Sequence, residues 1–282
     1  MRFLFLGDIV GRSGREVLAR ELPALRRDLK LDFVVANVEN AAAGFGVTKK
    51  IAQEILASGV DVMTGGNHSW DQREALSFIE GEPRLLRPAN YPAGTPGRGV
   101  AAFQTSTGKK VLIVNVLGRL FMDALDDPFQ TVAKALESYR LGATVDAIIV
   151  DMHAEATSEK MAMGHFCDGR ASLVVGTHTH VPTADTMVME GGTAYQTDAG
   201  MCGDYNSVIG MDKAVPVARF TKKLPTERMS VATGPGTLCG VLVESDPRSG
   251  LAKTVEPIRI GGVIRQADPR ARPQAAALAT AT

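Results

Sequence analysis

Apolar runs that end in metal-capable side chains are the feature of this 282-residue sequence that most constrains its fold. Five short runs predict buried strands, and each is followed within about four residues by Asp, Glu, Asn or His. Ligand-binding residues of α/β sheets gather at the carboxyl ends of strands, so residues distant along the chain can meet at one edge. The residues concerned are Asp8, Glu39 with Asn40, Asn67 with His68, His153, and His178 with His180.

The distribution of histidine supports this interpretation. The chain has five histidines, and only His165 lies away from the predicted strand ends. Taken singly, each motif has an ordinary explanation, since Gly7-Asp8 also makes turns and a lone His153 is more often structural. The combined donor set of imidazole, carboxylate and amide lacks thiolates, which suits Mn, Fe or Zn in a catalytic role. A carboxylate that bridges two ions about 3.5–4 Å apart would make a two-metal hydrolase.

The order of elements predicts an α/β fold with two mixed β-sheets packed as a sandwich and flanked by helices. Strands and helices alternate first, an antiparallel hairpin follows at 100–105 and 110–116, and further strands come later. We expect one domain over residues 1–265 and a flexible Pro-, Ala- and Arg-rich tail over 266–282. Thr48 is expected to cap a helix. The main expected strands are 2–6, 33–38, 60–63, 147–150 and 173–175, and the main expected helices are 14–30, 48–57, 72–80, 128–141 and 158–166.

The amino-acid composition limits the kinds of molecule that we expect this protein to bind. The formal net charge is zero, which argues against a protein that binds duplex nucleic acid by bulk electrostatics. An anionic substrate stays possible because a bound metal ion supplies local positive charge. No run approaches the roughly 20 apolar residues of a membrane span. The three cysteines lack a C-x-x-C spacing and predict reduced thiols in a cytoplasmic protein.

Taken together, the motifs resemble those of the calcineurin-like metallophosphoesterases, from the first strand to about His180. Longer strings resemble one bacterial branch, the YmdB-type, described as 2',3'-cyclic-nucleotide 2'-phosphodiesterases. Two departures from the broader family are shared with this branch: Val10 replaces a usual histidine, and Glu39 replaces the usual bridging aspartate. The strings that resemble the branch are GDIVG at 7–11, VEN at 38–40, GNHSWD at 66–71 and TDAGM at 197–201, whereas GTHTH at 176–180 is among the motifs that resemble the broader family.

The resemblance implies a ligand set and a mechanism. Two metal ions are expected, with Fe or Mn first and Zn possible, and Glu39 would bridge them. His68 would be the general acid, a metal-bound hydroxide would attack phosphorus, and a 2',3'-cyclic nucleotide would give the 3'-nucleotide. The resemblance also implies a homo-oligomer. One metal would have Asp8, Glu39, Asn40 and His180, and the other Glu39, Asn67, His153 and His178.

Several alternatives stay open from the residues alone. The glycine-rich segment 198–211 either walls the substrate pocket, with Tyr205 stacking on a base, or forms a surface or subunit-contact loop. His178 and His180 would face the same side if they lay in a regular strand. The same metal site would also serve a phosphomonoesterase or protein phosphatase, or a regulatory protein that binds metal and nucleotide, including one associated with RNA. A structural metal site fits poorly because such sites are usually Cys-rich.

Overall fold

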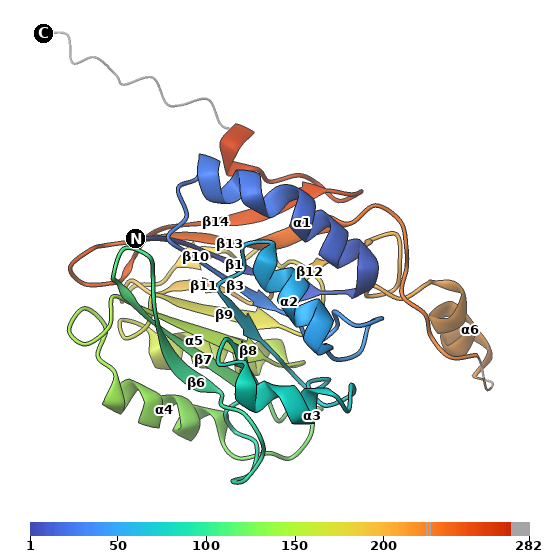
Figure 1. The fold of residues 1–282 in the computed structure, drawn as a ribbon, viewed down its shortest axis with the longest axis horizontal. Coiled ribbons are helices and arrows are strands. Elements are labelled where there is room, and N and C mark those ends of the chain that lie inside the picture. Colours follow the sequence, from blue (N-terminus) through green and yellow to red (C-terminus); the bar gives the residue numbers. More distant parts are fainter. Residues whose placement is uncertain (224, 226, 272–282) are drawn as a thin grey trace, which may run out of the picture.

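Two six-stranded mixed sheets packed face to face form the centre of the molecule, as predicted (Figure 1). The computed structural model describes residues 1–271 except 224 and 226. One sheet has the order β14 (Ala252–Gly261), β13 (Thr237–Ser245), β1 (Arg2–Leu6), β3 (Phe33–Asn37), β4 (Val62–Thr64) and β5 (Leu85–Leu86). The other has the order β10 (Met187–Val188), β11 (Ala194–Gln196), β9 (Leu173–Thr177), β8 (Ala147–His153), β7 (Lys110–Leu117) and β6 (Val100–Gln104).

Helices cover the outer faces of both sheets and complete four layers (Figure 1). The first sheet packs against Leu22 of α1 and Ile55 of α2, and the second against Val132 of α4 and Met163 of α5. Each such large apolar side chain contributes about 1.5–3 kcal/mol when it is buried. The helices are α1 (Gly11–Asp28), α2 (Lys49–Ala57), α4 (Pro128–Ser138) and α5 (Thr157–Cys167).

The alternation of side chains along each strand explains why each sheet has a hydrophobic core on both of its faces. Leu4 on β1 belongs to the core beneath the helices, whereas its neighbours Phe3 and Phe5 belong to the core between the sheets. Ile149 of the second sheet reaches this central core from the opposite side. Successive side chains of a strand point to opposite faces, so a wholly apolar strand has both faces buried.

The carboxyl ends of the parallel strands mark the edge where the polar residues collect. β1, β3 and β4 run parallel in one sheet, and β7, β8 and β9 run parallel in the other. A small third sheet closes this edge, in which β2 (Asp8–Ile9) pairs with β12 (Met201–Cys202). Asp8 therefore lies in a short strand of its own rather than in the loop that the sequence predicted.

Several expected elements have different bounds in the structure; the helices expected at 14–30 and 128–141, for example, are α1 (Gly11–Asp28) and α4 (Pro128–Ser138). The predicted helix at 72–80 is only α3 (Ala75–Phe78), continued by the 3-10 turn η1 (Ile79–Gly81). Its first residue, Gln72, instead donates its side-chain amide to the Phe45 carbonyl. The predicted strand at 147–150 extends to His153, which is thus its last residue. Thr48 caps α2 as predicted, since its hydroxyl accepts a hydrogen bond from the Ile51 amide.

The C-terminal region stays attached to the domain up to Ala271. Ala267 exchanges two backbone hydrogen bonds with Arg259 of β14, and a 3-10 turn, η2 (Pro269–Ala271), follows. Residues 272–282 of the predicted tail lie outside the described residues. Over the part of the chain that is described, the helices are too short or too polar to cross a membrane.

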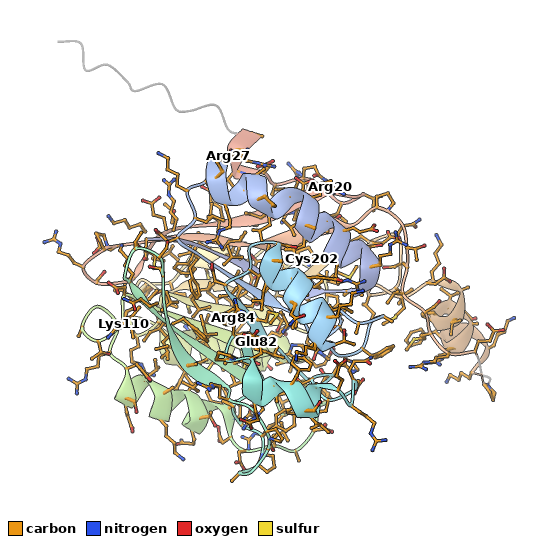
Figure 2. The ribbon with its side chains drawn as sticks, in the orientation of Figure 1. Arg20, Arg27, Glu82, Arg84, Lys110 and Cys202 are labelled. Atoms are coloured by element: carbon orange, nitrogen blue, oxygen red, sulfur yellow. The ribbon has the colours of Figure 1, made fainter. Side chains whose placement is uncertain are left out.

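One helix stands apart from the four layers. α6 (Ala214–Lys222) projects beside the edge where the parallel strands end (Figure 1). By contrast, α1 lies on a sheet, with Arg20 and Arg27 on its outer side and the buried Cys202 of β12 beneath it (Figure 2). Most of α6 is exposed, including Phe220 at 81%. Its position matters for the site described next.

Candidate metal and catalytic site

Three predicted ligands form a compact, buried cluster where the two sheets meet. Donor atoms of Glu39, His153 and His178 all lie within 4.8 Å of one another. His153 Nε2 lies 3.1 Å from Glu39 Oε1, 3.2 Å from His178 Nδ1 and 2.9 Å from Asn67 Oδ1. Glu39 follows β3 and His153 ends β8, so the cluster joins the first sheet to the second. The sequence predicted this convergence.

A second group of predicted ligands lies beside the first. His180 Nε2 is 3.2 Å from Asn40 Oδ1 and 3.9 Å from Asp8 Oδ1. The same Asp8 oxygen is 3.8 Å from His153 Nδ1, so this carboxylate lies between the two groups. Its Oδ1 atom is buried and has no hydrogen-bond partner among the described residues, whereas Oδ2 accepts from the His178 amide at 3.2 Å. A buried carboxylate oxygen left in this state fits a cation, because a buried charge must otherwise be paired.

Each ligand histidine has one nitrogen held by an oxygen atom and the other turned toward the site. His180 Nδ1 donates to the Ile209 carbonyl at 2.8 Å, which leaves Nε2 facing Asn40. In His178 the two ring nitrogens have the opposite roles: Nε2 pairs with Glu155 at 3.2 Å, and Nδ1 faces His153. Such outer partners fix the tautomer and orientation of a metal-binding imidazole. The donor arrangement therefore fits metal binding.

His153 has the most elaborate support of the three. The Thr177 hydroxyl donates to Asp151 at 2.7 Å, so it accepts from His153 Nδ1 at 2.9 Å. Asp151 also accepts from Thr64 at 2.6 Å and from Asn37 at 3.3 Å. The sequence analysis did not identify these supporting residues. In the sequence, such a supporting residue can be recognised as a polar side chain inside an otherwise apolar strand, as Asp151 is inside β8.

The electrostatics of the cluster favour a positive charge at its centre. Burial by itself would lower the pKa of His153, but the carboxylates of Glu39, Asp8 and Asp151 raise it to about 9. Burial raises the pKa of Asp8, partly opposed by His180 and His153. For Glu39, burial is outweighed by the charge and hydrogen bond of His153, which lower its pKa to about 2. The pKa of His178 falls to about 3, through burial and the nearby His153, so its ring is neutral and available as a ligand.

Gly66 explains how two chain segments come so close. A Cβ atom at this position would lie 2.2 Å from Glu39 Oε2 and 2.4 Å from His153 Nε2. Any side chain would displace both ligands, so only glycine fits. This agrees with the close backbone approach that the glycine pair before Asn67 predicts.

His68 lies at the edge of the cluster and is held without using its outer nitrogen. Its backbone amide donates to Glu39 Oε2 at 2.9 Å, and its Nδ1 donates to Asp71 at 2.8 Å. Its ring meets Phe45 edge-on, with ring centroids 5.2 Å apart. Nε2 is thereby left for a substrate. Asp71 was part of a sequence motif, but its orienting role becomes visible only in the structure.

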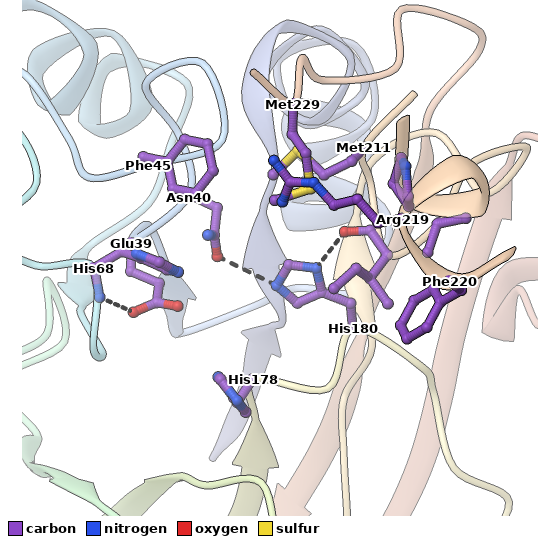
Figure 3. Close-up of a pocket in the computed structure, with 13 residues that line it drawn as sticks. Glu39, Asn40, Phe45, His68, His178, His180, Met211, Arg219, Phe220 and Met229 are labelled. Carbon is purple, nitrogen blue, oxygen red and sulfur yellow. Dashed lines mark hydrogen bonds between the residues drawn. The ribbon is translucent and has the colours of Figure 1, made fainter. Parts of the chain in front are cut away.

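A cavity of about 520 Å³ opens above these residues (Figure 3). Its floor contains Glu39, Asn40, His68, His178 and His180. Its rim comes from Phe45, from the end of the glycine-rich segment 198–211, which the sequence offered as one possible wall of the substrate pocket, and from later residues that the sequence did not identify as functional. The rim residues beyond Phe45 are Val208, Ile209 and Met211 of that segment, followed by Pro216, Arg219, Phe220 and Met229.

Tyr205 does not lie where the stacking hypothesis requires. It is not among the residues that line this cavity, and it lines a separate one with Pro182 and Arg259. Its hydroxyl is anchored on both sides by the backbone of Met201, at 2.8 and 3.1 Å. The glycine-rich segment thus supplies Val208, Ile209 and Met211 to the cavity instead of Tyr205.

His178 and His180 reach the site by a different route from the one expected. β9 ends at Thr177, and both histidines have positive φ angles, of 97° and 65°. They therefore lie in a tight loop, where strand alternation does not apply. The loop sends His178 to the group around His153 and His180 to the group around Asn40.

One family model and several curated proteins match most of this sequence. A family model described as YmdB-like protein matches residues 4–258. The 2',3'-cyclic-nucleotide 2'-phosphodiesterase of Bacillus subtilis strain 168 is 45% identical over 264 residues, covering 92% of this chain and 97% of that protein. A putative phosphatase/phosphodiesterase of Mycoplasma pneumoniae is 35% identical over 267 residues, covering 92% and 93%.

Solved structures agree over nearly the full length. A hypothetical protein from Thermus thermophilus gives a TM-score of 0.86 at 40% identity and covers 93% of this chain and 100% of that one. A structure described as a novel phosphatase from Mycoplasma pneumoniae gives 0.85 at 33% identity, covering 96% and 95%. The chain therefore belongs to the YmdB-like protein family.

Proposed function

We propose that this protein is a metal-dependent phosphodiesterase that opens 2',3'-cyclic nucleotides to 3'-nucleotides. One observation carries the proposal: seven buried or half-buried donor residues converge under a cavity whose edge holds an oriented histidine, His68. The Bacillus subtilis relative, named for this reaction, supports the choice of substrate.

The residues present fit a two-metal centre. Asp8, Asn40 and His180 would hold one ion, and Asn67, His153 and His178 the other, with Glu39 bridging as the family resemblance implies. The thiol-free donor set suits Fe or Mn, with Zn as a further candidate. When bound, two such ions would generate a nucleophile from water near neutral pH and polarise the phosphoryl group.

The chain itself supplies the proton and the binding surface. Asp71 holds His68 Nδ1, so Nε2 can carry the proton that the leaving 2' oxygen needs. Arg219 on the rim places a guanidinium by the same cavity, which favours an anionic substrate. The apolar side chains of the same cavity, among them Phe45 and Phe220, offer a surface on which a base can stack.

A pair of chromogenic substrates tests the reaction class. The purified protein with Mn²⁺ should hydrolyse bis-p-nitrophenyl phosphate faster than p-nitrophenyl phosphate. With 2',3'-cyclic AMP, chromatography should identify 3'-AMP as the product. Faster hydrolysis of the monoester would instead favour a phosphomonoesterase, an activity that the name of the Mycoplasma relatives leaves open.

The remaining rival is a regulatory protein in which turnover is incidental. A His68→Ala variant that binds nucleotide normally and keeps the cellular role would support that rival. We also propose a cytoplasmic homo-oligomer, in keeping with the three free, buried cysteines and the family resemblance. Light scattering on the purified protein measures its subunit number.

A further inference from the structure

A buried ion pair lies directly behind the loop that carries His178 and His180. Lys160 Nζ is 2.7 Å from Asp198 Oδ2, and the two side chains are 1% and 0% exposed. Lys160 comes from α5, the helix that follows the His153 strand, and Asp198 precedes β12. Removing two charges from water is costly, so a pair like this one persists only where further hydrogen bonds support it.

Both oxygens of Asp198 are used, and each is directed at a segment that carries metal ligands. Oδ2 accepts from the amide of Thr179 at 3.1 Å and from its hydroxyl at 2.7 Å. Oδ1 accepts from the Gly200 amide at 2.8 Å, and the Gly200 carbonyl in turn accepts from the Asp8 amide at 3.2 Å. Asp198 is thus linked to the loop between the two histidines and, through Gly200, to Asp8.

The loop needs such a restraint because its backbone is strained. His178 and His180 have φ angles of 97° and 65°, in the left-handed region that L residues rarely adopt. Thr179 lies between them, and it is the residue that Asp198 grips by both donors. A released loop would relax toward ordinary backbone angles and turn the two imidazoles away from their separate groups.

Lys160 is placed by a space that only glycine leaves open. A Cβ atom on Gly176 would lie 2.7 Å from the Lys160 side chain and 1.8 Å from the Thr197 carbonyl oxygen. The ammonium group can therefore pass beneath β9 and reach Asp198. Besides Lys160, Asp198 accepts hydrogen bonds from three further donors.

We infer that Lys160 and Asp198 are positioning residues of the metal centre: their buried ion pair holds the loop 178–180 so that His178 and His180 serve different ions. This inference rests on the proposed two-metal function. It assigns a role to the Asp198 motif, which neither the ligand set nor the general acid uses.

The test is a Co²⁺ titration of the metal-depleted protein, followed by visible absorption and by competition with a chelator. Wild type should take up two equivalents. K160M and D198N should bind at least one equivalent about tenfold or more weakly, as for other losses of outer support of metal ligands, and their absorption bands should shift. Circular dichroism at the titration temperature identifies variants that stay folded.

A matched control lies next to Lys160 on α5. Glu159 is also buried, but its carboxylate accepts from the amides of Arg119 and Leu120, which lie outside the loop 178–180. E159Q should lower the melting temperature and leave Co²⁺ affinity and spectrum unchanged. A merely structural role for Lys160 would give K160M this same pattern.

A milder variant keeps the test decisive if K160M and D198N fail to fold. T179V removes only the hydroxyl bond to Asp198 and should weaken Co²⁺ binding less than tenfold, with a smaller spectral shift. Folded variants that bind two ions with wild-type affinity and spectra would overturn the inference alone. Wild type that binds fewer than two ions would instead overturn the proposed two-metal function.

Discussion

The floor and the rim of the cavity are built in opposite ways. Floor residues such as Glu39 and Asn40 are almost completely buried and have polar partners from other chain segments, since Glu39 contacts His68 and His153 and Asn40 contacts His180. Rim residues such as Ile209 and Phe220 are apolar, largely exposed, and come from α6 and its flanking loops. The two regions are in direct contact, because the Ile209 carbonyl accepts the hydrogen bond that orients His180 and the Phe45 ring meets the His68 ring.

This difference separates two tasks. Chemistry on a phosphodiester needs donors fixed to within a fraction of an ångström, and buried networks between rigid strands provide that precision. Recognition of a base needs an apolar surface that tolerates substitution, and an exposed helix provides it. Changes in the floor should therefore affect metal content and turnover, whereas changes in the rim should affect substrate affinity.

The largest effect is expected from Glu39→Gln. The pKa of Glu39 is lowered to about 2, so the variant removes a fixed negative charge from the cluster while it keeps the side-chain volume. Metal ions supply several kcal/mol of transition-state stabilisation, so kcat/KM should fall by about a thousandfold or more. Plasma emission spectrometry should find fewer than two ions per chain.

The exposed Glu137 on α4 offers a matched control for this change. Glu137→Gln removes the same charge far from the cluster and should keep full metal content and turnover. A Glu39→Gln variant with two bound ions and normal activity would contradict the division of tasks between floor and rim, since the floor would then not be the catalytic region.

The sequence predicted the floor better than the rim for a physical reason. Metal ligands are chemically distinctive, so Asp8, Glu39 and the histidines after buried strands were visible as a pattern. For the rim, the glycine-rich segment 198–211 indicated a possible pocket wall, but nothing in the sequence distinguished Val208 or Phe220 from other apolar residues. Tyr205 attracted the base-stacking hypothesis as the aromatic residue near the glycines, but tertiary hydrogen bonds to Met201 hold it elsewhere.

Local backbone conformation was the second feature that could not be predicted from the sequence. Strand alternation predicted that His178 and His180 share a face, yet their positive φ angles belong to a loop set by distant contacts. The ion pair of Lys160 and Asp198 joins residues 38 positions apart and has no local sequence signature. Fold class, by contrast, follows from repeated apolar periodicity over many residues, which is why the two sheets were predicted correctly.

An intermediate effect is expected from His68→Ala. His68 lies at the boundary between floor and rim and is not a predicted ligand, so metal content should stay at the wild-type value. General acid catalysis contributes roughly 100- to 10,000-fold, so kcat should fall within that range while KM changes little. A loss of metal together with activity would contradict the assigned role and place His68 among the ligands.

Asp71→Asn tests how far the role of His68 depends on its orientation by Asp71. The amide oxygen can still accept a hydrogen bond from His68 Nδ1, but the negative charge that strengthens this bond is lost while the side-chain size is kept. We expect a fall in kcat of about tenfold with unchanged metal content, because the imidazole is still present but less well oriented. A loss as large as that of His68→Ala would mean that Asp71 takes a direct part in proton transfer.

The smallest effect is expected from Phe220→Ala on the rim. Stacking of a base on an aromatic ring is worth about 1–3 kcal/mol, so KM for 2',3'-cyclic AMP should rise by about tenfold. Since Phe220 is 81% exposed, the melting temperature should not change, and kcat and metal content should stay near wild type. Val263→Ala is the control, because Val263 is 66% exposed and does not line the cavity. A fall in kcat for Phe220→Ala with unchanged KM would show that the rim helps to arrange the catalytic groups, and the division between floor and rim would then fail.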